Sequence, residues 1–165
     1  MTPAPHESDP RHLLEQMLLI RAYEEAIVAG SDAGKIPGTC TSVGQEAAAV
    51  GVVNALTPDD LILTNHRSAG HLLARGADPG RLMAEVMGRA DGYCRGKSGS
   101  LHVSAKELGV VLTSTIVGGE LSLAPIFCAS ATPGASDSSP PTMVEVSTTP
   151  SSLADTCSEP LLPLQ

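Results

Sequence analysis

Aromatic residues are scarce in this sequence, and tryptophan is absent. The 165 residues include two tyrosines and one phenylalanine, whereas large aromatic rings usually supply much of a protein core. We therefore expect a core of Leu, Val, Ala, Ile and Met. The length is sufficient for one domain of ordinary size.

Basic side chains are missing from the last third of the chain. All ten Lys and Arg lie in residues 1–106, together with twelve acidic residues, and residues 107–165 hold six acidic residues and no Lys or Arg. The net charge is -8. This charge argues against a nucleic-acid partner, which would require a basic surface.

Cysteine pairs, long apolar runs and a signal peptide are also missing. The four cysteines are far apart and form no CxxC motif, so neither a zinc ribbon nor a redox motif is indicated. No apolar segment approaches membrane-spanning length, and the polar, proline-rich start MTPAPHESDP does not match a signal peptide. These features predict a cytoplasmic protein with reduced cysteines and no membrane partner.

Two Asp-Pro pairs predict the starts of helices. Asp9 and Asp78 would each act as N-cap, with the following proline in the first turn. Apolar residues recur at helical spacing after both pairs. The first helix is expected to end at Gly30 or Gly34, because glycine commonly ends helices. Residues 44–56 predict a further helix of small residues.

A short apolar run, Leu61–Leu63, predicts a buried strand that leads into a polar cluster. The cluster includes His66 and Arg67. In α/β proteins, the carboxyl end of a strand is where anion sites are built, and the arginine fork suits phosphate. Two plainer alternatives remain open: Arg67 pairs with a surface carboxylate, and His66 caps a helix.

Residues 88–102 form a glycine-rich, basic stretch. Its Gly96-Lys97-Ser98 segment is similar to a P-loop, but Asp91 occupies the position that requires the first glycine. The element before it is also a predicted helix, not a strand. We therefore reject a P-loop. With Arg89, Arg95, Lys97 and many free amides, this stretch could still surround an anion, and the alternative is a mobile, solvated basic loop.

The rest of the chain divides into two parts. Residues 108–111 predict a short strand, and residues 113–119 a compact turn whose glycines would let a ligand approach backbone amides. Residues 125–165 contain seven Pro, eight Ser and five Thr, and no Lys, Arg or His. This composition predicts disorder. The expected organisation is therefore a flexible segment 1–8, a domain at 9–124 and a disordered tail at 125–165.

Six sequence blocks together resemble the alpha subunit of thiamine-diphosphate-dependent 2-oxo acid dehydrogenases, the pyruvate, branched-chain and acetoin dehydrogenase group. The blocks follow the order found in that family, with similar gaps, over roughly residues 11–124. They are MLLIRAYEEAI (17–27), GKIPG (34–38), VGQEAAAVGVVNAL (43–56), TNHRSAGHLLARGADP (64–79), MAEVMGRADGYCRGKSGSLHV (83–103) and TIVGGELSLA (115–124).

The resemblance implies a fold and a cofactor site. The fold would be α/β: the helix-rich N-terminal part of a thiamine-diphosphate-binding, doubly wound fold. The cofactor's diphosphate would contact an Arg, with His where the family usually has Tyr, and a glycine turn, with Thr where the family often has Gly. The resemblance assigns no catalytic residue. The implied cofactor-binding residues are His66, Arg67, Thr115, Ile116, Val117 and Gly118.

Magnesium ligands are not found where the resemblance would place them. The family holds Mg²⁺ through the Asp of a GDG motif and a later Asn, and such oxygen ligands suit a hard cation. This sequence has no GDG, and its only asparagines are Asn54 and Asn65. We therefore expect no metal ligand in the chain. Our hypothesis is that the chain is truncated and that residues 125–165 come from a shifted reading frame.

The resemblance also implies a reaction and partners. The reaction would be oxidative decarboxylation of a 2-oxo acid with acyl transfer to a lipoyl group, or cleavage of acetoin. The partners would be a beta subunit in a heterotetramer and a lipoyl acyltransferase. The chain alone is expected to be inactive. Two alternatives remain: it docks a beta subunit without catalysis, or it does not fold stably because half a sheet leaves edges uncovered.

Overall fold

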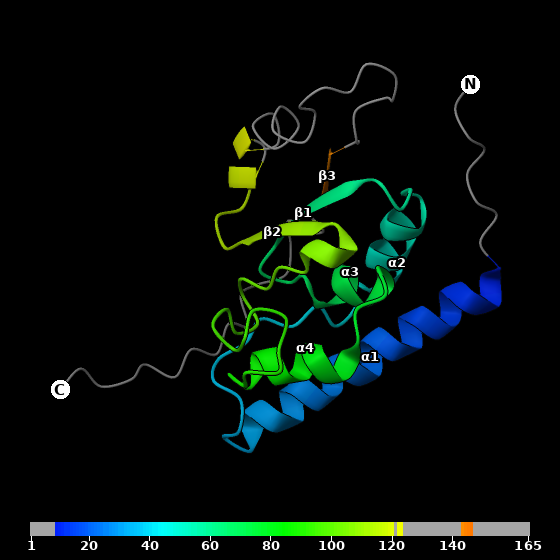
Figure 1. Ribbon diagram of the computed structural model, residues 1–165. Helices are drawn as coiled ribbons and strands as arrows, with labels where there is room; N and C mark the ends of the chain where they lie inside the picture. The colour runs from blue at the N-terminus through cyan, green and yellow to red at the C-terminus, as the bar shows by residue number, and fades with distance from the viewer. Residues whose placement is uncertain (1–8, 121, 124–142, 147–165) are drawn as a thin grey trace, which may run out of the picture.

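The computed structural model describes residues 9–120, 122–123 and 143–146 (Figure 1). Helices dominate this part of the chain, and three short strands form one sheet. In chain order the elements are α1 (Pro10–Asp32), α2 (Glu46–Asn54), β1 (Leu61–Asn65), α3 (Ala69–Ala74), α4 (Pro79–Val86), the 3-10 helix η1 (Lys106–Leu108), β2 (Val110–Ser114) and β3 (Met143–Val146).

Both predicted Asp-Pro helix starts are confirmed. The Asp9 carboxylate accepts a hydrogen bond from the backbone N–H of Arg11 at 3.0 Å, and Asp78 accepts one from Arg81 at 2.7 Å. Each side chain therefore satisfies a backbone donor that the first helical turn leaves without a partner. Helix α1 ends just before Gly34, whose φ of +69° permits the left-handed turn that closes it.

The three strands run parallel in the order β2-β1-β3. Strand β1 is therefore central, and Ile62 and Leu63 on its two faces are fully buried. The predicted helix-rich α/β class is confirmed. The chain adds β2 on one side of β1 and β3 on the other, so a topological switch point lies at the carboxyl end of β1.

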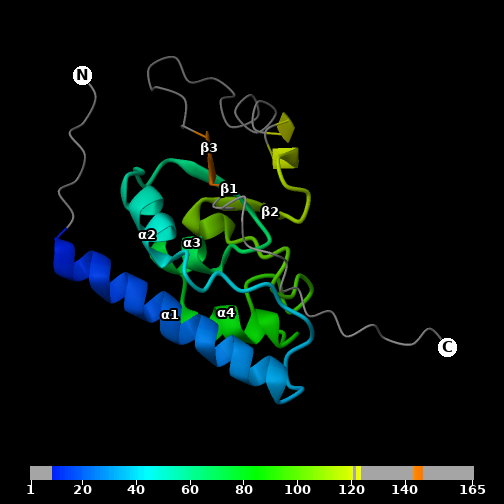
Figure 2. The same ribbon diagram turned by 180° about the vertical axis from the view of Figure 1, so that it is seen from behind.

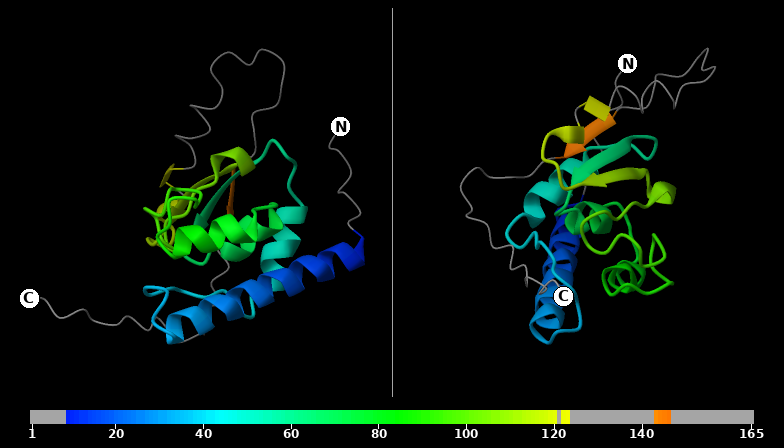
Figure 3. Two further views of the ribbon diagram at one scale, coloured as in Figure 1. Left: turned by 60° about the horizontal axis from the view of Figure 1, so that its bottom comes forward. Right: turned by 90° about the vertical axis from the view of Figure 1, so that its left-hand side faces the viewer.

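The helices form a layer under the sheet. In Figures 1 and 2 the long helix α1 runs along the outside, and α2 and α3 lie between it and the strands. Helices α1, α2 and α3 contact one another, and Figure 3 shows α4 beside this group. The core is aliphatic, as predicted, with Tyr23 as its only buried aromatic residue among those described. None of the described helices is long and apolar enough to cross a membrane.

The second strand lies later than the sequence predicts. Residues Lys106–Leu108 form η1, and Gly109, at φ +77°, ends that turn. Strand β2 then covers Val110–Ser114. The predicted turn at 113–119 is correspondingly shorter, because its first two residues belong to β2 and helical backbone begins at residue 119. A left-handed glycine separates the two elements, and apolar patterning alone does not reveal it.

Strand β3 lies within the segment that the sequence predicts to be disordered. For Met143–Val146 that prediction is wrong, because these four residues pair with Leu61–Thr64 of β1. Pairing supplies partners for a strand edge of β1 that would otherwise be open. A composition averaged over 41 residues cannot reveal a four-residue strand. The remaining residues of 125–165, and residues 1–8, lie outside the described part, so those predictions stay predictions.

Candidate functional site

The two segments singled out by the sequence leave the same edge of the sheet. Strands β1 and β2 are neighbours, and Asn65 pairs with Ser114 at their carboxyl ends. His66 follows Asn65 directly, and Thr115 follows Ser114. Because β1 and β2 lie side by side (Figure 1), the His66-Arg67 pair and the turn at 115–118 start from neighbouring strand ends.

The two plainer alternatives for His66 and Arg67 do not hold. Arg67 donates from Nη1 to the carbonyl oxygen of Thr41 at 3.2 Å, and it takes part in neither ion pair found among the described residues. Ser68, rather than His66, is the N-cap residue of α3. Arg67 is therefore held by a backbone oxygen and forms no direct ion pair with a described carboxylate.

Buried polar atoms without a partner gather at this edge. Four consecutive residues at the end of β1 each carry one such atom: Asn65 Nδ2, His66 Nδ1, Arg67 Nε and Ser68 Oγ. Buried polar groups are nearly always hydrogen-bonded, and an unsatisfied one costs about 1–3 kcal/mol. Doubly wound proteins bind ligands at the carboxyl ends of their strands, so these four atoms mark a candidate ligand site.

Electrostatics identify the groups that face His66. Burial is the main cause that lowers its pKa, and the positive charge of Arg67 and the nearby His102 lower it further. The carboxylate of Glu120 opposes this shift. His66 is therefore neutral at pH 7, with one ring nitrogen able to donate and the other able to accept. Arg67 supplies the positive charge at the edge.

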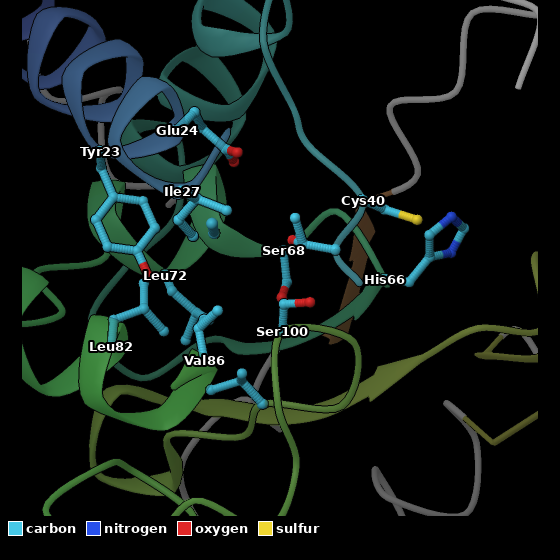
Figure 4. A pocket seen from close by; sticks show the side chains of 13 residues that line it. Tyr23, Glu24, Ile27, Cys40, His66, Ser68, Leu72, Leu82, Val86 and Ser100 are labelled. Atoms are coloured by element: carbon cyan, nitrogen blue, oxygen red, sulfur yellow. The ribbon is translucent and has the colours of Figure 1, made fainter. Parts of the chain in front are cut away.

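A small pocket extends from this edge into the helical layer (Figure 4). Cys40 and His66 lie at one side, Tyr23 at the other, and Ser68 and Ser100 between them. Except for Cys40, each of these residues carries a buried polar atom with no partner. The pocket therefore continues the polar edge inward, and it brings the loop that carries Ser100 to the end of β1.

One wall of the pocket carries a buried carboxylate, that of Glu24. Burial raises the pKa of Glu24, and the hydrogen bond from Ser42 Oγ to Glu24 Oε1, 2.5 Å long, opposes the rise. The negative charge of Glu46 raises it further, whereas Arg67 lowers it. Burial and Glu24 together raise the pKa of Tyr23. The Glu24 carboxylate on α1 therefore interacts electrostatically with the positive charge of Arg67.

The glycine-rich basic loop does surround an anion, and that anion belongs to the protein. The Glu85 carboxylate accepts N–H groups of Cys94 at 2.7 Å, Gly96 at 2.8 Å and Ser98 at 2.9 Å, and the Ser98 hydroxyl at 2.7 Å. The sequence left a ligand-binding loop and a solvated loop open, and the structure corresponds to neither. Glu85 was not predicted because nothing in its local pattern distinguishes it from a solvent-facing helical Glu.

No cluster of three or more His, Cys, Asp or Glu side chains suited to a metal occurs in the described ranges. Cys94 is not in a disulfide and donates to the carbonyl of Ser104 at 3.3 Å.

Three further residues at the site, Asn65, Ser100 and Glu120, were not predicted from the sequence. Asn65 could have been predicted, because it is a polar residue at the end of an apolar strand. Ser100 and Glu120 could not, because only the tertiary fold brings them to the edge at His66.

An α/β chain with polar groups at the carboxyl edge of its central parallel strand has the general layout of a ligand-binding, doubly wound protein. The family model for the dehydrogenase E1 component matches residues 15–139. The chain belongs to the dehydrogenase E1 component family. The resemblance inferred from six sequence blocks is confirmed, and the match continues past Ala124, where those blocks end.

Curated relatives agree with this assignment. The chain is 39% identical over 113 residues to the alpha subunit of acetoin:2,6-dichlorophenolindophenol oxidoreductase of Bacillus subtilis, covering 68% of this chain and 34% of the relative. It is 41% identical over 126 residues to the pyruvate dehydrogenase E1 component subunit alpha of Zymomonas mobilis, covering 73% and 36%. The mitochondrial Saccharomyces cerevisiae subunit is 46% identical over 94 residues, covering 56% and 22%. The chain spans about a third of the length of the two bacterial relatives.

Proposed function

We propose that this chain provides the diphosphate-binding wall of a thiamine-diphosphate site in an E1 alpha subunit. The observation that carries the proposal is the row of buried, unpartnered polar atoms from Asn65 to Ser68 at the end of β1. Beside it, the turn at 115–118 leaves the neighbouring strand. Membership of the dehydrogenase E1 family supports the choice of cofactor.

The residues at the edge fit a diphosphate in charge and in hydrogen-bonding capacity. Arg67 has a buried Nε without a partner and no carboxylate paired to it, and charge-assisted bonds from Arg to phosphate are among the strongest. Neutral His66 would donate one further hydrogen bond. At the turn, Gly118 has φ +80°, and nothing lies within 4 Å of the position that a Cβ would take, so backbone amides there are open to a close approach.

The other proposed residues flank these contacts. Ile116 and Val117 are 72% and 55% exposed, which is unusual for large apolar side chains and suits a surface covered by a cofactor or a partner subunit. Thr115 begins the turn directly after β2. Glu120 is the group that disfavours an anion here, because it places a buried carboxylate close to His66.

The bound cofactor would supply the carbanion chemistry by which the 2-oxo acid or acetoin is cleaved. The chain's own residues would hold and orient it: Arg67 offsets negative charge, His66 donates a proton in a hydrogen bond, and the pocket lined by Tyr23 and Ser100 limits access of water. A beta subunit would complete the site, and the alpha-subunit relatives support that partner. A lipoyl acyltransferase would accept the acyl group.

The test is calorimetric titration of thiamine diphosphate with Mg²⁺ into the chain, with and without a beta subunit. We expect binding only with the beta subunit, because the chain alone provides one wall of the site and lacks the family's magnesium ligands. Arg67→Ala should weaken binding roughly 10- to 100-fold, the effect of losing one charge-assisted hydrogen bond. Arg81→Ala is the matched control, because Arg81 is exposed and pairs with Glu107.

Three results would count against the proposal. Equal affinity of wild type and Arg67→Ala would remove Arg67 from the site. Tight binding of thiamine diphosphate by the chain alone would contradict the expected dependence on the beta subunit. A complex with the beta subunit that takes up no cofactor would favour the docking alternative, in which the chain contributes a surface and no cofactor contact.

A further inference from the structure

Glu85 is a buried carboxylate that is enclosed by a single loop. The side chain is fully buried at the end of α4, and four donors from Cys94, Gly96 and Ser98 converge on its two oxygens at 2.7–2.9 Å. Successive N–H groups that point into one concavity are the usual way in which a loop binds an anion. Here the loop uses a side chain of its own protein as that anion.

The backbone of the loop is shaped around this contact. A Cβ on Gly92 would lie 2.5 Å from Glu85 Cα and 2.7 Å from its N, so only glycine permits the approach. Arg95, a non-glycine residue, has φ +58°, and Gly96 follows at φ +72°. A left-handed Arg backbone costs about 1–3 kcal/mol, and it persists only where surrounding contacts enforce it. The Glu85 hydrogen bonds are those contacts.

The same loop delivers two side chains to the edge of the sheet. Ser98 binds Glu85, and two residues later Ser100 lines the pocket beside His66. His102 is close enough to His66 to lower its pKa. At the end of the loop, Thr113 Oγ1 donates to the carbonyl oxygen of Val103 at 2.6 Å and joins the loop to β2. The loop is thus fixed at both ends, by Glu85 and by β2.

We propose that Glu85 is a positioning residue: as an internal anion it folds the loop at 92–98 and so places Ser100 and His102 against His66. This role deepens the proposed function, because it rests on the edge at His66 being the cofactor wall. The positive side chains of the loop, at positions 89, 95 and 97, are exposed and do not contribute to the contact. The contact is made by three backbone N–H groups and the Ser98 hydroxyl.

The test compares hydrogen exchange and histidine titration in the full chain without cofactor. Glu85→Gln keeps the shape but replaces an acceptor by a donor that faces other donors. The N–H groups of Cys94, Gly96 and Ser98 should then exchange roughly 10- to 100-fold faster. The pKa of His66, followed by NMR, should rise as His102 moves away and burial decreases. Amides of β1 report whether the core remains folded.

Two further variants keep the test decisive. Ser98→Ala removes one of the four hydrogen bonds and should give the same changes in smaller measure, even if Glu85→Gln fails to fold. Glu107→Gln removes an exposed carboxylate and should change neither the loop amides nor His66. Unchanged loop exchange in both Glu85→Gln and Ser98→Ala would overturn the proposal, as would a loosened loop with an unchanged His66 titration. Because no cofactor is present, none of these outcomes depends on thiamine diphosphate binding.

Discussion

Replacing Gly92 by Ala should destabilise the fold far more than the same change at other glycines. The added Cβ would lie 2.5 Å and 2.7 Å from backbone atoms of Glu85 in α4, and a helical backbone cannot move aside as a flexible side chain can. Overpacking typically costs about 1–3 kcal/mol. Displacing Glu85 also weakens charge-assisted hydrogen bonds of about 1.5–3 kcal/mol each. We expect a loss of about 3 kcal/mol or more in the free energy of unfolding.

Gly51→Ala provides the matched comparison. Gly51 lies exposed within α2, and nothing is found within 4 Å of its added Cβ. Alanine is favoured over glycine in a helix interior by about 0.5–1 kcal/mol, so this variant should be more stable than the wild type.

Urea unfolding followed by circular dichroism measures both changes, provided that unfolding is cooperative. Absence of a cooperative transition would support the alternative that the chain does not fold stably. A loss below about 1 kcal/mol for Gly92→Ala, within the range of ordinary substitutions, would refute the close approach of the loop to α4. Destabilisation by Gly51→Ala would refute the open surroundings of α2.

Two other predictions concern acid stability and the coding DNA. Burial lowers the pKa of His71 from 6.5 to about 4. The unfolded chain therefore binds more protons between these values, and the free energy of unfolding falls as pH falls through that window. Between pH 7 and pH 5 the loss should be about 2 kcal/mol larger in the wild type than in His71→Asn, and equal losses would contradict the burial of a neutral His71. The family match as far as residue 139 counts against a frame shift at codon 124. Such a shift predicts that the DNA beyond that codon, read one or two bases out of frame, encodes a Gly-Asp-Gly motif; sequencing that finds none in either frame would disprove it.

Local chemistry made several elements predictable. Asp9 and Asp78, each before a proline, marked the starts of α1 and α4, because an N-cap needs only residues adjacent in sequence. The apolar run that begins at Leu61 marked β1 for a similar reason: a central parallel strand is buried on both faces and therefore reads as continuous apolar sequence. The His66-Arg67 pair stood out because it follows that strand directly.

Contacts between distant residues were not predictable from the sequence. Nothing near Glu85 indicates that amides of residues 94–98 will enclose it, since a helical Glu beside a basic loop usually faces solvent. Glu120 and Ser100 reach the edge at His66 only because β2 and the loop before it return to β1. The strand at Met143–Val146 was missed because its four residues form a strand only by pairing with β1.

The sequence by itself determined the family, the helix starts and the strand that ends in His66 and Arg67, because each depends on residues that are close along the chain or on blocks in a fixed order. The tertiary structure alone decided which groups meet at the end of β1 and which anion the basic loop holds. The physical reason is that strand pairing and burial bring together side chains that are tens of residues apart in the sequence. No local sequence pattern shows which of these distant residues will meet.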